Sequence, residues 1–166
     1  MMDTHLSKRS FLGSAAAALT AFALPACAKR GEARTGERFE VTKTPAEWKR
    51  QLGPARYAVL REESTERAGS SPLNGEKRRG TYVCAGCALP LYSSATKYES
   101  GTGWPSFFRP LANAVRTKED RGFFGTRTEV HCRRCGGHLG HVFDDGPPPT
   151  GKRYCMNGLA MRFVAA

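Results

Sequence analysis

The stretch "HCRRCGGHLGHVF" (residues 131–143) holds a closely spaced pair of cysteines, Cys132 and Cys135. A second pair with the same spacing, Cys84 and Cys87 in "CAGC", precedes it by 44 residues (132 − 87 − 1). Two intervening residues let both thiolates of a pair face one ion, and two such pairs supply the four sulfur ligands of a tetrahedron. The spacing therefore predicts a closed structural zinc site that joins two distant segments of the chain.

Two alternatives to this ligand set remain open on the residues alone. In an exported protein the same cysteines could form two disulfides, although a disulfide within Cys-x-x-Cys is usually redox-active. His138 and His141 follow the second pair and could also bind the ion. Four cysteines already complete a structural zinc site, so we expect neither histidine to be a ligand.

Short segments that favour β-strands surround both cysteine pairs. They are rich in β-branched and aromatic residues and are bounded by glycine and proline. The segments are "TYVC", "LPLYSS", "PSFFRP", "FFGTRTEVH", "HVFD" and "RYCMNGLAMRFV". The 18 glycines and 10 prolines also argue against a helical bundle. We therefore expect a mainly β domain with antiparallel sheets.

A helical lead-in is expected before the strands. "TPAEWKRQLG" (residues 44–53) begins with an N-capping threonine and a proline at the first helical position, and Glu47 completes a capping box. Its last residue, a glycine, is a typical helix terminator. Trp48 and Leu52 are four residues apart and should face the core together. "YAVLREEST" (residues 57–65) is a candidate for a second short helix.

The first 28 residues have the pattern of an export signal. A polar segment ending in two cations precedes an apolar, small-residue run. "SKRSFL" is similar to a twin-arginine signal, and "LPAC" is similar to a lipobox that would place a lipid on Cys27; cleavage after Ala28 is the alternative. Residues 29–40 are expected to be a flexible tether and residues 41–166 the folded domain. These features predict an exported, periplasmic protein that a lipid on Cys27 would anchor to a membrane.

The chain is strongly basic, with a formal net charge of +11. Such a charge suits nucleic acid or an anionic membrane surface as a partner. No basic run is interleaved with aromatic residues as in a nucleic-acid-binding module, and the export signal points away from nucleic acid. We therefore expect no nucleic-acid partner.

Cys155, in "GKRYCMN" (residues 151–157), has no cysteine near it in sequence. With the other four domain cysteines assigned to zinc, it is a candidate nucleophile. Arg153 and a histidine would favour its thiolate form. Asn157 falls on the same strand face as Cys155, where an amide is of more use in a site than in a core. An inert, buried cysteine is the alternative interpretation.

Longer strings resemble the B-type methionine sulfoxide reductases. They are "YVCAGC", "ESGTGWPSF" (residues 99–107) and "HCRRCGGHLGHVFDDGPPPTGKRYCMN" (residues 131–157), within a similarity that runs from about Trp48 to Phe163. The resemblance implies two antiparallel sheets in a tent-like arrangement with zinc on the two cysteine pairs. It also implies peptide-methionine (R)-S-oxide reductase activity, with oxidised proteins as substrates. We expect a monomer.

The resemblance assigns roles to individual residues. Cys155 would attack the sulfoxide sulfur and become a sulfenic acid, while His138 and His141 would bind and protonate the sulfoxide oxygen. Asn157 would orient the histidines and water, and Arg153 would favour the thiolate; a surface salt bridge is the alternative for this arginine.

Two aromatic residues complete the implied site. Trp104 would pack on the S-methyl group of the substrate, and Phe143 would line the same pocket. Both residues could instead be purely structural. For residues 64–74, the sequence supports no assignment to the site.

Two positions depart from the family pattern. Many members read S-G-C-G-W-P-S-F, where the cysteine resolves the sulfenic acid, but this chain has Thr102. The resemblance then implies that an external thiol, either a thioredoxin-like protein or a small thiol, reduces the enzyme. Gly158 stands where a serine is usual. The rival functions are a zinc-ribbon binding module and a reductase of free methionine sulfoxide with the opposite epimer preference.

Overall fold

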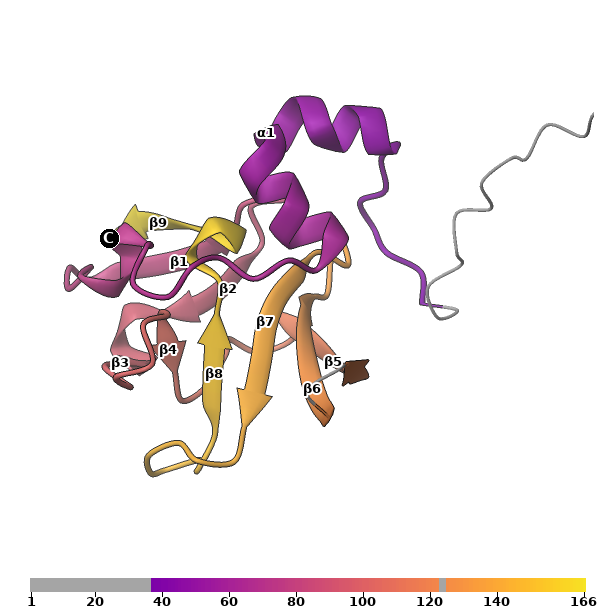
Figure 1. Cartoon of the computed structure of the whole chain (residues 1–166). Helices are drawn as coiled ribbons and strands as arrows, with labels where there is room; N and C mark the ends of the chain where they lie inside the picture. The colour runs from indigo at the N-terminus through magenta and orange to yellow at the C-terminus, as the bar shows by residue number, and fades with distance from the viewer. Residues whose placement is uncertain (1–36, 123–124) are drawn as a thin grey trace, which may run out of the picture. The chain divides into compact units, whose positions relative to one another are not determined.

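A computed structural model describes residues 37–122 and 125–166 of the chain (Figure 1). The expected export signal, Cys27 and residues 29–36 of the expected tether lie outside the described residues. Within the described ranges, no helix combines the length and the apolar character needed to cross a membrane.

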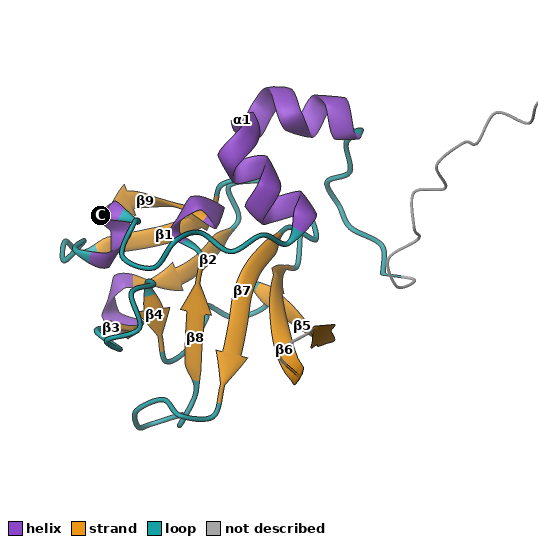
Figure 2. Cartoon of the chain, viewed as in Figure 1, coloured by secondary structure: helices purple, strands orange, loops and turns teal. Residues whose placement is uncertain are grey.

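The described chain is mainly β-structure, as the sequence predicts (Figure 2). One sheet has three strands in the order β2-β1-β9, and the other has six in the order β3-β4-β8-β7-β6-β5. All pairings are antiparallel. The strands are β1 (Gly80–Cys84), β2 (Pro90–Ser93), β3 (Lys97–Tyr98), β4 (Ser106–Phe107), β5 (Val115–Gly122), β6 (Gly125–Cys132), β7 (His138–Phe143), β8 (Arg153–Met156) and β9 (Met161–Ala165). The helices are α1 (Pro45–Glu62) and the 3-10 turns η1 (Pro72–Asn74), η2 (Ser94–Thr96) and η3 (Gly158–Ala160).

Helix α1 confirms the expected lead-in and extends it. The hydroxyl of Thr44 accepts from the Glu47 amide at 3.3 Å, and the Glu47 carboxylate accepts from the Thr44 amide at 2.8 Å, which completes the capping box. Gly53 has φ of +69° and interrupts the helix, so the two expected helices are joined at a kink. Trp48 and Leu52 are buried on one face, as predicted.

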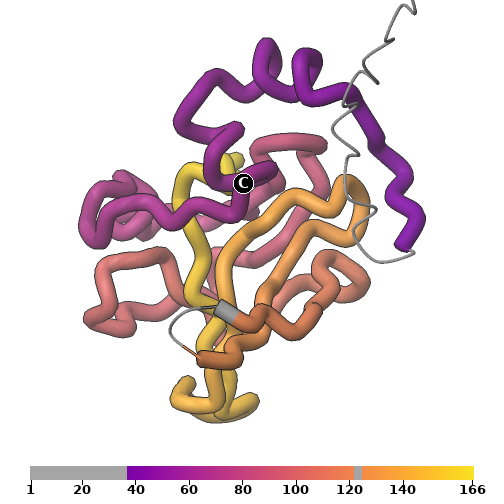
Figure 3. The backbone as a smooth tube through the Cα atoms, turned by 45° about the vertical axis from the view of Figure 1, so that its right-hand side comes forward, coloured from indigo at the N-terminus to yellow at the C-terminus, as the bar shows by residue number. Residues whose placement is uncertain are grey.

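Residues 37–41 lie beside the turn between β6 and β7 (Figure 3). The Val41 amide donates to the Arg134 carbonyl at 3.0 Å, and the Glu37 carboxylate accepts from the His131 ring at 3.1 Å. Glu40 forms an ion pair with Arg133. The last residues of the segment assigned to the tether therefore contact the domain.

Aromatic packing in the core fixes the position of β8. Phe107 stacks on Tyr92 with 4.3 Å between ring centroids and meets Tyr82 edge-on at 4.9 Å. All three rings are fully buried, and such pairs stabilise a core beyond their buried area by about 1 kcal/mol each. The Tyr92 hydroxyl donates to the Met156 sulfur at 3.1 Å. The residue next to Cys155 is thus held by the core.

Strand register places a row of polar side chains across the six-stranded sheet. Directly opposed residues of antiparallel strands share a face. The row consists of Tyr98, Ser106, Cys155, His141, Glu129 and Lys118, one from each strand from β3 to β5. At Gly140, a Cβ atom would lie 2.1 Å from the Cys155 carbonyl oxygen, so glycine permits the close approach of β7 and β8. Cys155 therefore lies opposite His141.

Gly158 faces a side chain that occupies the space of its missing Cβ. A Cβ atom at this position would lie 1.8 Å from the Ser71 hydroxyl oxygen and 2.5 Å from the Ser71 Cβ. Ser71 itself is held in place, because its hydroxyl accepts from the Leu73 amide at 3.1 Å. Glycine at 158 and serine at 71 thus share one small volume of the core.

We expect Gly158→Ser to lower the free energy of unfolding by about 1–3 kcal/mol, the usual cost of overpacking. Adding Ser71→Gly should recover most of that loss, because the two side chains compete for the same space. Urea unfolding of wild type, both single variants and the double variant measures the coupling. Strictly additive effects would contradict the shared-volume explanation.

Candidate functional site

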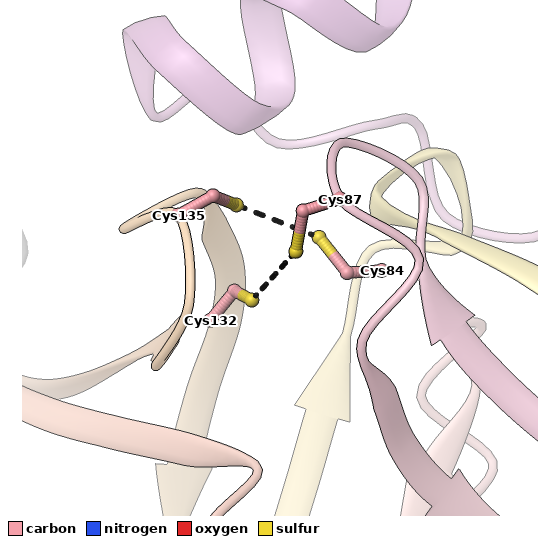
Figure 4. A group of neighbouring side chains, drawn as sticks. All are labelled: Cys84, Cys87, Cys132 and Cys135. Carbon is pink, nitrogen blue, oxygen red and sulfur yellow. Dashed lines mark hydrogen bonds between the residues drawn. The ribbon is translucent and has the colours of Figure 1, made fainter. Parts of the chain in front are cut away.

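Four cysteine sulfurs converge from the two cysteine pairs (Figure 4). The sulfurs of Cys84 and Cys135 are 3.7 Å apart, those of Cys87 and Cys132 are 3.5 Å apart, and all four lie within 4.8 Å of one another. Sulfurs about 2.3 Å from a tetrahedral zinc ion are roughly 3.8 Å apart, so the cluster fits that ion. A disulfide needs about 2.05 Å between sulfurs, so these cysteines form none in this structure.

One ring nitrogen of each nearby histidine contacts a carboxylate and not the cysteine cluster. His138 Nδ1 contacts Glu129 at 2.9 Å, and His141 Nε2 contacts Asp120 at 2.8 Å. Among the described residues, the metal-binding cluster consists of the four cysteines alone. A bound zinc ion would join the two chain segments and, with four thiolates around it, would have no open position for a substrate.

A pocket of about 120 Å³ lies against the polar row of the six-stranded sheet. Its lining brings together most residues that the sequence pointed to, namely Cys155, His141, Asn157, Trp104 and Phe143. His138 and Arg153 do not line it. A larger cavity, of about 570 Å³, lies beside η1, η3 and β9, but it is lined by neither cysteine nor histidine. The smaller pocket therefore carries the reactive groups.

Each histidine of "HLGH" is paired with a carboxylate from the β5–β6 hairpin. Glu129, which is 3% exposed, accepts from His138 and also pairs with Lys118 at 2.7 Å. Burial alone would raise the pKa of Glu129, but the hydrogen bonds from His138 and Lys118 lower it overall. The other ring nitrogen of His138, Nε2, is buried and has no protein partner among the described residues. That nitrogen is free for a water molecule or a ligand.

His141 lies directly opposite Cys155 in the β7–β8 pairing and pairs with a second carboxylate. Asp120 accepts from its Nε2 and also pairs with Arg127 at 2.7 Å. The hydrogen bond from His141 is the largest of the effects that keep the pKa of Asp120 low. Burial lowers the pKa of His141, although Asp120 opposes this change. The charged ring is therefore a stronger acid than a free imidazolium.

Glu66 positions two residues of the pocket, although the sequence of residues 64–74 gives no sign of a role in a site. Its carbonyl accepts from Trp104 Nε1 at 3.1 Å, and its amide donates to Asn157 Oδ1 at 2.9 Å. Its buried carboxylate accepts from the amides of Gly158 at 2.6 Å and Leu159 at 2.9 Å. Glu66 therefore ties the loop after α1 to both the indole and the amide.

Asn157 contacts the loop after α1 and the backbone of the histidine strand β7. Its Oδ1 accepts from Glu66, and its Nδ2 donates to the Leu139 carbonyl at 3.2 Å. Leu139 lies between the two histidine positions on β7, so the amide holds the histidine strand through its backbone.

Arg153 makes the ion pair that was the alternative expectation for it. Its Nε and Nη2 donate to the two carboxylate oxygens of Asp145 at 2.8 Å each. The guanidinium lies 4.3 Å from the centroid of the Phe143 ring, which it holds against the pocket.

Thr102 lies next to the nucleophile candidate. Its Oγ1 is 3.8 Å from Cys155 Sγ, within contact distance for a hydroxyl and a sulfur. A cysteine at this position would have its sulfur close to that of Cys155. The threonine noted in the sequence thus places a hydroxyl, and not a thiol, next to the Cys155 sulfur.

The family model for the SelR domain matches residues 52–165 of the chain. The chain belongs to the family of B-type methionine sulfoxide reductases. It is 54% identical over 124 residues to the peptide methionine sulfoxide reductase MsrB of Methanosarcina barkeri, covering 74% of this chain and 87% of that protein. It is 50% identical over 126 residues to the MsrB of Leptospira interrogans, covering 75% and 96%.

Two further comparisons concern a plant enzyme and a solved structure. The chloroplastic peptide methionine sulfoxide reductase B1 of Arabidopsis thaliana is 50% identical over 120 residues, which cover 72% of this chain and 59% of that protein. The crystal structure of the Mis18 "Yippee-like" domain has a TM-score of 0.45 and 17% identity, and it covers 54% of this chain and 98% of that domain.

Sequence reasoning missed three acidic residues of this site in a B-type reductase. Asp120 and Glu129 lie on neighbouring strands of a hairpin, and their histidine contacts depend on strand register. Glu66 lies in a loop without recognisable periodicity. The one sequence signal was the acidic residue within the strand-like "TRTEVH", because a carboxylate on a buried strand face needs a partner.

We expect removal of zinc to destabilise the fold. A ligand present at a thousandfold excess over its Kd stabilises the folded state by about 4 kcal/mol, so chelation or Cys87→Ser should cost about that much. Native mass spectrometry for zinc, together with urea unfolding, measures both effects. Cys155→Ser is the matched control and should keep metal and stability. A metal-free protein of unchanged stability, or a mass lower by four hydrogens, would argue against the zinc site.

Stability should fall as the pH drops from 7.5 to 5.5. Burial lowers the pKa of His131 and of His141. The unfolded chain, with histidines near about 6.5, therefore binds more protons than the folded chain in this range, and acid favours unfolding. Urea midpoints at the two pH values should differ less in a chain carrying His131→Gln and His141→Gln. Protonation of the zinc ligands affects both chains, so an equal pH response in the two would refute the histidine explanation.

Proposed function

We propose that this protein reduces methionine (R)-sulfoxide in oxidised proteins to methionine, with Cys155 as the nucleophile. The observation that supports this assignment best is the pocket in which Cys155 lies opposite His141 and beside the indole of Trp104. Family membership supports reduction of methionine sulfoxide as the activity. The lining of the pocket supports a role for Cys155, His141 and Trp104 in that reaction.

In the proposed first step, the Cys155 thiolate attacks the sulfoxide sulfur. This attack forms a bond between the two sulfurs. Once the oxygen is protonated, the hydroxyl group passes to the Cys155 sulfur while the sulfur–sulfur bond breaks, which leaves methionine and a sulfenic acid on Cys155. The substrate sulfur is thereby reduced by two electrons, and the cysteine sulfur is oxidised by two. His141 supplies the proton to the developing oxyanion, because its lowered pKa makes the charged ring a ready acid. Asp120 orients the ring. The free Nε2 of His138 is the second candidate partner for the oxygen or for a bound water.

The apolar part of the substrate would lie against the aromatic side chains. Trp104 is half-buried, and its Nε1 is held by the Glu66 carbonyl, so one indole position is favoured. Phe143 also lines this pocket, and the guanidinium of Arg153 packs on its ring. Two fixed rings suit an S-methyl group, which prefers an apolar surface of defined shape. The pocket is small, which suits one side chain of a larger protein.

The catalytic cycle would end with an external thiol. Thr102 cannot form a disulfide with Cys155, and the remaining described cysteines lie together in the zinc-type cluster. A first external thiol attacks the sulfenic acid, which forms a mixed disulfide and releases water. A second thiol then frees Cys155 and leaves as the oxidised disulfide. A thioredoxin-like protein supplies both thiols from one molecule, and a small thiol supplies them from two.

We propose further that the protein acts after export, as a periplasmic monomer. The signal-like residues 1–28 support export, and the "LPAC" string supports a lipid on Cys27. A membrane-anchored repair enzyme would meet oxidised exported proteins. Mass spectrometry of the protein from membranes, with Cys27→Ser as the control, distinguishes a lipidated N-terminus from cleavage after Ala28.

Cys155→Ser should abolish sulfoxide reduction and leave zinc content and unfolding midpoint unchanged. The loss should exceed about a thousandfold, because serine is a far weaker nucleophile at neutral pH. Turnover of the R and S epimers of a capped methionine sulfoxide, with dithiothreitol as reductant, measures the activity. Activity on the R epimer alone is the expected result.

Three results would refute parts of this assignment. Retained turnover in Cys155→Ser excludes this nucleophile, and preference for the S epimer excludes the stereochemical assignment. After one turnover without reductant, intact mass should rise by one oxygen, and dimedone should label Cys155. An intramolecular disulfide instead, seen as a loss of two hydrogens, would refute the one-cysteine cycle.

A further inference from the structure

A continuous line of hydroxyl groups begins at Cys155. Thr102 Oγ1 lies 3.8 Å from the Cys155 sulfur and 2.8 Å from Ser100 Oγ. Ser100 Oγ is 2.8 Å from Ser106 Oγ, which lies 3.1 Å from the carbonyl oxygen of Trp104. The line therefore joins the candidate nucleophile to the backbone of Trp104, whose indole lines the pocket.

This line of hydroxyl groups has two states, which differ in whether Cys155 carries a hydrogen. Each of the three hydroxyls has one hydrogen to donate, and the Trp104 carbonyl has none. When Cys155 is a thiol, its S–H donates to Thr102, and the hydroxyls donate in turn toward the Trp104 carbonyl, so every link in the line is a hydrogen bond. When Cys155 is a thiolate, the three hydroxyl hydrogens are too few to complete every link.

When Cys155 is a thiolate, the most favourable arrangement reverses the direction in which all three hydroxyls donate their hydrogen bonds. Ser106 then donates to Ser100, Ser100 donates to Thr102, and Thr102 donates to the sulfur. Reversal replaces a neutral hydrogen bond to the Trp104 carbonyl with a hydrogen bond to a negatively charged sulfur. A charge-assisted hydrogen bond is roughly twice as strong as a neutral one, so the exchange favours reversal. Each hydroxyl in the line also polarises the next.

We propose that Thr102 is a catalytic residue that stabilises the Cys155 thiolate by hydrogen bonding, and that Ser100 and Ser106 are positioning residues that orient its hydroxyl. The threonine thus has a role of its own in the site, in addition to standing where a second thiol is absent. A cysteine at this position would be a weak donor, whereas a hydroxyl is a strong one. The inference rests on the proposed function only in taking Cys155 as the reactive thiol.

The surroundings of the hydroxyl line support a fixed geometry. Ser106 is 1% exposed and lies opposite Cys155 in the β4–β8 pairing. The Thr102 amide points at Ser100 Oγ, with 3.5 Å between the nitrogen and the oxygen, which adds a donor that does not reverse. His141, Arg153 and Tyr98 also face or interact with Cys155, and they remain unchanged in the test below.

Alkylation of Cys155 tests this inference without any sulfoxide. Full-length, zinc-loaded protein is treated with iodoacetamide at pH 7, and peptide mass spectrometry follows the modification of Cys155. Thr102→Val keeps the shape of the side chain and removes the hydroxyl, and it should lower the rate constant about tenfold. Thr102→Ser keeps the hydroxyl and should stay within about twofold of wild type. Ser100→Ala should slow alkylation severalfold, because the Thr102 hydroxyl loses its orientation.

Two controls separate hydrogen bonding from packing. Ser94→Ala removes a serine hydroxyl outside the hydroxyl line and should leave the rate unchanged. At pH 10, above the ordinary cysteine range of about 8.5, all variants should alkylate equally. A wild-type rate in Thr102→Val at pH 7, equal slowing in Thr102→Ser, or persistent slowing of Thr102→Val at pH 10 would each overturn the inference. Because the sulfoxide plays no part here, loss of the proposed function would show separately, as retained turnover in Cys155→Ser.

Discussion

The four cysteine sulfurs meet between the end of β1 and the turn that joins β6 and β7, so a metal ion bound to them would hold one sheet against the other. From this junction β7 carries the histidines, β8 pairs with β7, and the chain continues through η3 into β9, which pairs with β1. These connections form a closed loop that returns to the cysteines. At Gly137 a Cβ atom would lie 2.8 Å from Leu60, so α1 packs directly on the turn. Zinc in this cluster would fix the frame of the site while taking no part in its chemistry.

Within that frame, the site uses buried charges in pairs. Burying a histidine or a carboxylate alone is costly, but here His138 meets Glu129 on the neighbouring strand β6, and His141 meets Asp120 on β5, two strands away. Lys118 and Arg127 complete the two pairs at the outer edge, where β5 and β6 are partly exposed. The hairpin therefore acts as a support for the histidine rings, and the direction of its hydrogen bonds fixes which ring nitrogens remain available for a ligand.

The sequence allows the parts of the site that depend on local spacing to be predicted. The cysteine pairs, the capping box and the break at Gly53 each follow from residues a few positions apart, and each is confirmed. Cys155 could be singled out because the other domain cysteines had a role. Contacts between distant residues could not be predicted in this way. Asp120 and Glu129 reach the histidines through strand register, and Glu66 reaches Asn157 across 91 positions of sequence.

The two departures from the family pattern have different physical consequences. At Gly158, the space freed by the missing side chain is filled by Ser71, so packing is kept and no reacting group changes. At Thr102, the change adjoins the sulfur of the proposed nucleophile, Cys155. A cysteine there would store the second pair of electrons within the protein, whereas a hydroxyl can only stabilise charge. Under the proposed mechanism, the chain would therefore have a hydrogen-bond donor at the position where a cysteine could act as an internal reductant. In the proposed cycle, each turnover would require a collision with an outside thiol, and the sulfenic acid would have to remain accessible until that collision occurs.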